Sequence, residues 1–247
     1  LLLATIVSQG YSAFYQTYVK LDVFLDPEVI DPSGSRDPEA LGRADYGELV
    51  TQTLYRAFPD VTDRRDRRDL RGMVSFGATI QVRDAVLADP SLIGTTVPLW
   101  LLADDEVDQF WKGKVDRERP ESERRINDRT IGWIDALAAE GRVAARFNRN
   151  FFFTGDSREP EMAGLYGALK GSLYMMLVTL ALSVPTGIAA AIYLEEFAPK
   201  GRVTDLIEVN VNNLAAVPSI VFGLLGLAVF LNTFGLPRSS PLVGGMT

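Results

Sequence analysis

The pattern of apolar and polar positions divides the chain near residue 165. Residues 171–194 form 24 consecutive positions without a charged side chain, and residues 209–237 form 29 more. An α-helix rises about 1.5 Å per residue, so roughly 20 apolar residues cross a hydrocarbon layer about 30 Å thick. The pattern therefore predicts membrane helices near 165–196 and 214–234. Buried core helices are the alternative, and it is disfavoured because such helices rarely run so far without a polar face.

Before residue 165, the apolar positions repeat with the short periods of strands and amphipathic helices. Residues 13–25 alternate with a period of two, which predicts a strand, and residues 95–102 and 142–153 predict two more. Pro98 favours an edge position for the second strand. Helical spacing is expected over 46–57, over 60–87, over 104–111 and over 129–140, the last of these capped by Asp128 in front and Gly141 behind. These elements predict an α+β domain over residues 11–158.

Charged side chains are distributed along the chain as unevenly as apolar ones. Residues 166–247 hold four basic and four acidic side chains, so the net charge of −7 belongs to the residues before them. Arginines and aspartates alternate at helical distances between 60 and 71, and they neutralise each other's field. We expect a solvated helix face there and no nucleic-acid partner.

Several kinds of chemistry are excluded by composition. The chain has no cysteine and no histidine, which removes thiol and imidazole nucleophiles and the usual zinc sites. Residues 164–172 resemble a nucleotide-binding loop in composition, but Lys170 neither follows a glycine nor precedes Ser or Thr. We therefore expect no enzyme activity, no cofactor and no metal, and we expect that any ATP is used by another subunit.

The beginning and end of the chain also carry a prediction. It starts at Leu1 without a methionine, and its first residues are apolar but too few to span a membrane. We interpret residues 1–10 as the end of a first transmembrane helix and the whole sequence as a truncated fragment.

Two segments suggest a family. Residues 193–200 read Tyr-Leu-Glu-Glu-Phe-Ala-Pro-Lys, and residues 213–226 read Asn-Leu-Ala-Ala-Val-Pro-Ser-Ile-Val-Phe-Gly-Leu-Leu-Gly. Lys200 and Arg202 favour a cytoplasmic position for the connection between the spans, because short cytoplasmic loops are enriched in basic residues. Residues 160–247 resemble the A-type permease subunit (PstA type) of the bacterial phosphate-specific ABC importer. Residues 1–158 resemble an extra domain found in some of these permeases between the first two membrane helices.

The resemblance implies a fold class and a set of partners. The fold would be a mostly α-helical polytopic membrane protein, a partial type I ABC importer permease with an inserted soluble α+β domain. It would lie in the bacterial inner membrane as a multi-pass protein, with residues 11–158 in the periplasm. Its partners would be membrane lipid, a second permease subunit, ATP-binding subunits and a periplasmic phosphate-binding protein. The family's Glu-Ala-Ala coupling loop and the charged residues of its last helices have no counterpart in these 247 residues.

Asn213, Pro218, Ser219 and Gly223 are the candidate site residues, as lining of a substrate pathway or as helix contacts, since polar and small residues within a span usually face protein or water. Two alternatives stay open: the permease of another anion importer, and a membrane-tethered sensor or adaptor with an extracytoplasmic binding domain. The negative charge of the N-terminal domain would repel phosphate at long range, so we expect it to serve as a docking surface for the binding protein or a sister subunit.

Overall fold

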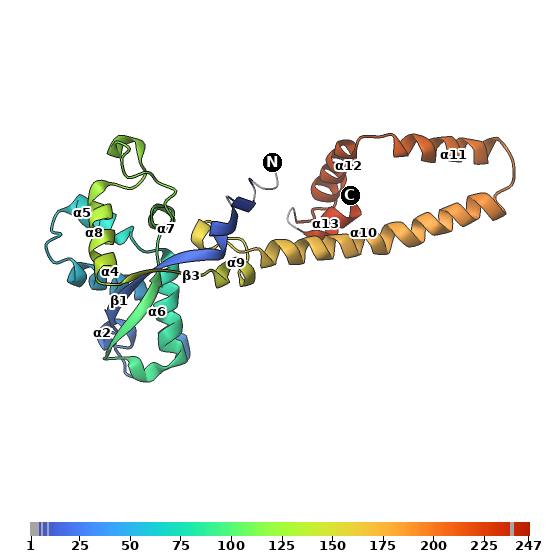
Figure 1. The fold of residues 1–247 in the computed structure, drawn as a ribbon. Coiled ribbons are helices and arrows are strands. Elements are labelled where there is room, and N and C mark those ends of the chain that lie inside the picture. The colour runs from blue at the N-terminus through green and yellow to red at the C-terminus, as the bar shows by residue number, and fades with distance from the viewer. Residues whose placement is uncertain (1–4, 6, 9, 238–239) are drawn as a thin grey trace. The chain divides into compact units, whose positions relative to one another are not determined.

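The computed structural model describes residues 5, 7, 8, 10–237 and 240–247. The chain separates into two compact units, Leu1–Leu165 and Tyr166–Thr247 (Figure 1). The division lies where the pattern of apolar residues changes.

A three-stranded antiparallel sheet forms the centre of the first unit. Its middle strand is β1 (Tyr15–Phe24), with β2 (Thr96–Leu102) on one side and β3 (Val143–Phe147) on the other. Alternation along β1 directs Val19, Leu21 and Val23 into the interior, where none has exposed surface. The predicted strands are all present, and Pro98 lies in an edge strand as expected.

The third strand is shorter than the sequence suggested. It was expected to reach residue 153, but it ends at Phe147 and is followed by helix α9 (Arg149–Phe153). Asn148 causes the change, because its side-chain oxygen accepts a hydrogen bond from the backbone N–H of Phe151 (3.0 Å) and caps the helix.

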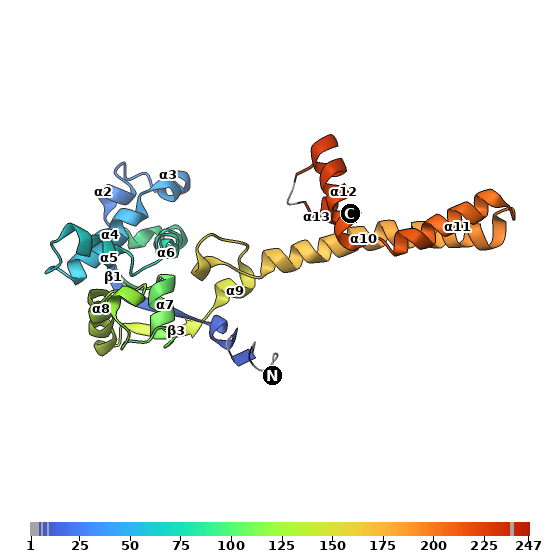
Figure 2. The same ribbon diagram turned by 90° about the horizontal axis from the view of Figure 1, so that it is seen from above.

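Helices pack against the sheet, with α4 against β1, α6 against β2, α7 against β1 and α8 against β3 (Figure 2). Their bounds are α2 (Pro27–Ile30), α3 (Pro38–Arg43), α4 (Tyr46–Ala57), α5 (Arg64–Arg71), α6 (Phe76–Ala88), α7 (Asp105–Trp111) and α8 (Asp128–Ala139). Short 3₁₀ turns are η1 (Tyr11–Phe14), η2 (Pro90–Leu92), η3 (Glu121–Glu123) and η4 (Pro160–Met162). One continuous apolar cluster fills the space between the helices and the sheet.

Two helix predictions need correction. The expected helix over 60–87 is interrupted after Arg71, where Val74 bridges to Ala103 and Ser75 caps a new helix. The cap of α8 is Asn127, which accepts from the N–H of Thr130 (2.8 Å), and not Asp128. Gly141 does follow the helix, with a positive φ of 68° that suits glycine.

Residues 154–165 form a strap that returns to the body of the first unit. Gln16 donates its side-chain N–H to the backbone oxygen of Glu161 (2.7 Å), and Ser75 donates its hydroxyl to the Glu161 carboxylate. A Cβ at Gly164 would collide with the hydroxyl oxygen of Thr154, so this close approach requires glycine. Glu161 therefore fastens the strap to β1 and to the start of α6, and Gly164 lets its two ends meet.

The second unit contains a long helix followed by shorter ones. Helix α10 (Tyr166–Ile192) continues into a π-helical turn, η5 (Tyr193–Phe197), and together they form one helix of 32 residues. The helix runs through Pro185 without interruption and changes to π geometry only at Tyr193.

The helix expected over 214–234 is present from Ser219 to Thr233, and its start is marked by a bend. Helix α11 (Arg202–Ala215) precedes it, and α12 (Ser219–Gly226) with the π-helical η6 (Leu227–Thr233) follows. The two arms meet at 97°. Pro218 lies at the break and explains it. Proline lacks the backbone N–H that a helical hydrogen bond needs, and it disfavours helical geometry in the residue before it. Among the described residues, one helix is long and apolar enough to cross a membrane, and the bent pair makes a second if it counts as one span.

Candidate functional site

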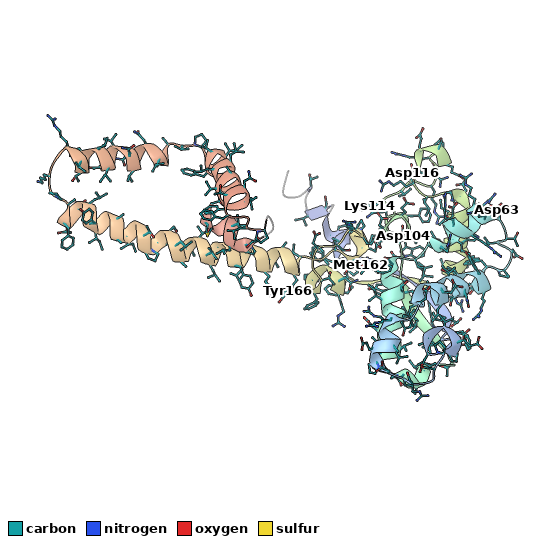
Figure 3. All side chains as sticks on the ribbon, turned by 180° about the vertical axis from the view of Figure 1, so that it is seen from behind. Asp63, Asp104, Lys114, Asp116, Met162 and Tyr166 are labelled. Carbon is teal, nitrogen blue, oxygen red and sulfur yellow. The ribbon has the colours of Figure 1, made fainter. Side chains whose placement is uncertain are left out.

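The long helix carries aromatic and basic residues near both ends. Near its start, the amine of Lys170 lies 5.8 Å and 5.7 Å from the ring centroids of Tyr166 and Tyr174. Near its end are Tyr193 and Phe197, and Lys200 comes shortly after. Aromatic rings and basic chains of this kind favour the two interfaces of a bilayer. Apolar side chains project from α10 around its whole circumference (Figure 3), which suits a helix enclosed by lipid or by other helices.

A close helix contact lies where the sequence did not point. Helix α13 (Pro241–Met246) packs on α10, and a Cβ at Gly244 or Gly245 would approach Met175 or Val178 to 2.6 Å or 2.7 Å respectively. Small residues permit such contacts between membrane helices. Gly171, near the start of α10, makes no such contact, since nothing lies within 4 Å of its Cβ position.

The four candidate residues lie together at the bend. Asn213 is in the last turn of α11, Pro218 is in the break, Ser219 begins α12, and Gly223 lies one turn further on. All four are exposed, and the Cβ position of Gly223 is open. Within the part of the chain that the structure describes, no side-chain contact joins them, so they share a segment without forming a closed pocket.

Backbone groups near the break are partly satisfied by turns. The oxygen of Asn213 accepts from the N–H of Ala216 (3.1 Å), and the oxygen of Pro218 accepts from the N–H of Val221 (2.9 Å). A discontinuous helix of this kind is a frequent feature of binding sites in transporters, where unwound backbone faces the substrate. The bend is thus the most informative feature of the second unit.

A half-buried acidic group in the first unit was not anticipated. This group is Asp104, and Figure 3 labels it together with Met162. Burial raises the pKa of Asp104 to about 7 despite a backbone hydrogen bond from Glu106 that lowers it, and the negative charges of Asp105 and Glu161 raise it further. This carboxyl can hold a proton near neutral pH. Among the described residues, no group of three or more carboxylates is placed to hold a metal ion.

A neighbouring carboxylate has a structural role. Asp108 is buried, accepts from the backbone N–H of Thr17 (2.8 Å), and pairs with the amine of Lys112 (2.5 Å). Polar residues in loops and at helix ends give no burial signal in a sequence, so neither Asp108 nor Glu161 could be singled out in advance.

The arginine-rich helix behaves as predicted. Its arginines are exposed, and they are balanced by carboxylates and rings. Arg129 of α8 pairs with Asp66, and the guanidinium of Arg67 lies 4.9 Å from the ring centroid of Tyr55. These contacts support a solvated, self-neutralised face.

Known proteins resemble parts of this chain. A family model described as "Domain of unknown function (DUF3333)" matches residues 1–121. The probable ABC transporter permease protein YqgI of Bacillus subtilis is 33% identical over 105 residues, which are 42% of this chain and 35% of that protein. The chain is similar to ABC transporter permeases.

Two further permeases extend this similarity. The phosphate transport system permease protein PstA 1 of Mycobacterium tuberculosis is 38% identical over 77 residues, 31% of this chain and 25% of that protein. A PstA homolog of Mycoplasma pneumoniae is 32% identical over 69 residues, 28% of this chain and 11% of that protein. The chain spans about a third or less of these permeases. No solved structure matches.

The permease similarity agrees with the helix that could cross a membrane. The relatives are named as transport permeases. The bend and its four residues are the part of the chain where a permease role can be tested directly.

Proposed function

We propose that the protein containing this chain is a permease subunit of an ATP-driven importer of inorganic phosphate, and that this chain forms part of its translocation pathway. The observation that carries the proposal is the 97° break in an otherwise apolar segment, at Pro218, in a chain similar to phosphate transport permeases. Broken helices provide polar backbone within a membrane without exposing it to lipid.

The arrangement in the cell follows from this proposal. The protein would span the bacterial inner membrane several times, with residues 11–158 in the periplasm and Lys200 on the cytoplasmic side. A second permease, two ATP-binding subunits and a periplasmic phosphate-binding protein would complete the importer. ATP hydrolysis by the partner subunits would switch the pathway between its outward-open and inward-open states.

The four bend residues would act by position. Asn213 and Ser219 would offer an amide and a hydroxyl to the pathway, while Pro218 would fix the break and Gly223 would keep one face of α12 free of side chains. Because the Cβ position of Gly223 is open, a larger residue there conflicts only with a helix or subunit that covers this face in the assembled transporter.

The test is phosphate uptake by cells that lack their own high-affinity importer and carry the full-length gene with its partner genes. We expect Gly223→Leu to abolish uptake while the assembled complex is still recovered, and Gly223→Ala to transport as the parent does. Full uptake by the Leu variant would remove Gly223 from the pathway. Uptake of sulfate but not phosphate by the parent would assign the importer to another anion.

A further inference from the structure

Five phenylalanines gather at one end of the first unit, and we call them the aromatic foot: Phe14, Phe147, Phe151, Phe152 and Phe153. Phe152 is central, with its ring centroid 5.9 Å from that of Phe14, 5.4 Å from Phe147 and 5.2 Å from Phe151. The rings of Phe14, Phe147, Phe151 and Phe152 contact one another, and Phe153 follows them at the end of α9. Phe153 is 71% exposed and Phe147 is 55% exposed.

This surface stands apart from the rest of the first unit. Elsewhere among its described residues, the large apolar side chains that are exposed and not next to the foot are Phe76 and Leu87. Val7, Tyr11, Tyr15 and Leu165 are also exposed, and each lies near the foot in the chain or bonds to it. Scattered apolar residues are normal on protein surfaces, whereas a contiguous aromatic patch marks a contact with another apolar phase.

The foot lies where the chain enters and leaves the domain. Asn148, between β3 and α9, donates its backbone N–H to the oxygen of Phe14 (2.8 Å) and its side-chain N–H to the oxygen of Ala13 (3.1 Å). Leu165 donates its N–H to the oxygen of Phe151 (2.7 Å). The next residue, Tyr166, begins the helix that could cross a membrane. The hydrogen bond from Leu165 therefore keeps Phe151 of the foot close to the residue that precedes that helix.

Basic residues accompany the rings. Arg149 begins α9, and Arg146 lies with its guanidinium 4.0 Å from the ring centroid of Trp100; both are exposed. Positive charge beside an apolar surface complements lipid phosphates, even though the chain as a whole is acidic. Tyr11 and Tyr15 add rings with polar tips, which suit the headgroup layer.

We propose that the aromatic foot inserts into the outer headgroup layer of the membrane that α10 crosses, so that the N-terminal domain rests on lipid and is held at a fixed height. This proposal rests on α10 being a membrane span, but not on phosphate being the substrate. Burial of the rings in lipid removes them from water, and Arg146 and Arg149 contact the phosphates.

The absence of cysteine makes a direct test possible, because a single introduced cysteine carries the only spin label. The whole chain is reconstituted into vesicles of phosphatidylcholine and phosphatidylglycerol with a nitroxide at Phe153→Cys. Collision rates are measured with oxygen, which concentrates in lipid, and with a water-soluble nickel chelate. We expect oxygen to relax this label several-fold more effectively than the chelate does.

Two matched labels separate the ways in which the test can fail. Glu28→Cys lies in α2, beyond the far end of β1, which at about 3.3 Å per residue is roughly 30 Å from Tyr15; it should favour the chelate. Leu180→Cys, near the middle of α10, should favour oxygen. If Leu180→Cys favours the chelate, α10 is no span and the proposed function fails with it.

If Leu180→Cys favours oxygen while Phe153→Cys resembles Glu28→Cys, the foot does not enter lipid and only this inference fails. If Phe153→Cys becomes shielded from both reagents only after a second permease is added, the foot contacts protein and the inference is wrong. Tryptophan emission checks folding in each variant, since Trp100, Trp111 and Trp133 all lie in the first unit.

Discussion

Leucine side chains occupy opposite environments in the two units. Leu21 in β1 has no exposed surface, whereas Leu180 in α10 is 50% exposed. The first unit encloses its apolar side chains within its own helices and sheet, and the second unit turns them outward. The difference shows that the first unit carries its own solvent boundary, while the second requires lipid or further helices to complete it.

The largest expected effect tests the enclosed core. Leu21→Ala leaves a cavity at the centre of the sheet and should lower the free energy of unfolding of the first unit by about 2–5 kcal/mol. Denaturant titration of the detergent-solubilised chain, followed by tryptophan emission, measures this unit alone because all three tryptophans lie in it. Leu180→Ala is the control and should leave the transition unchanged. Equal shifts in both variants would contradict the contrast between the units.

The next prediction exchanges the two environments. Leu180→Arg near the middle of α10 should cost about 2.5–3.5 kcal/mol in membrane insertion, because a charge is placed within hydrocarbon. Leu87→Arg is the matched control in α6, where the side chain is 37% exposed, and a surface substitution there should change stability by less than about 0.5 kcal/mol. An insertion assay measures the first variant and denaturant titration the second. If Leu180→Arg inserts as well as the parent does, α10 does not face lipid.

The two units also differ in how well the sequence predicts them. In the first unit, alternation along 13–25 and helical spacing along 46–57 locate β1 and α4, because one face of each is buried and the period records it. The break between α5 and α6 was missed. Val74 and Ser75 are held there by Ala103 and Glu161, which are distant in the sequence, and no local pattern records such contacts.

In the second unit, length and apolarity predict α10 but not the bend between α11 and α12. Pro218 was recognised as unusual, yet whether a proline bends a helix depends on the groups that surround it. The helix runs through Pro185 and breaks at Pro218. The close contact at Gly244 and Gly245 depends on Met175 and Val178, some 70 residues earlier, and periodicity carries no trace of it.

A smaller effect concerns proton binding, and it belongs to the first unit alone. Since burial raises the pKa of Asp104 from 3.8 to about 7, the folded state holds a proton in this range that the unfolded state has released. The stabilising contribution of Asp104 to the free energy of unfolding is therefore fully present below about pH 4. It is lost as the pH rises toward 7, by on the order of 1 kcal/mol per pH unit.

Asp104→Asn should remove this dependence while keeping a side chain that accepts from the N–H of Glu106. The variant should be more stable than the parent at pH 8, and the advantage should vanish near pH 4. Denaturant titration at both pH values measures the difference. Glu118→Gln removes one exposed charge and serves as the control. A constant difference between Asp104→Asn and the parent at both pH values would show that Asp104 titrates normally.

The smallest effect concerns the start of α8, where the sequence placed the cap one residue too late. The Asn127 side chain accepts from the backbone N–H and the hydroxyl of Thr130 and donates to the Asp69 carboxylate (2.9 Å), so Ala at this position removes three interactions. Serine retains a capping oxygen but cannot reproduce the longer contact to Asp69. The difference between Asn127→Ala and Asn127→Ser therefore isolates the cap, and we expect serine to be more stable by about 1 kcal/mol. Trp133 lies within α8 and reports this transition directly. Because the helix belongs to the self-enclosed unit, the difference should be the same in detergent and in lipid vesicles, and a dependence on the lipid would show that the boundary between the units does not isolate α8 from the membrane.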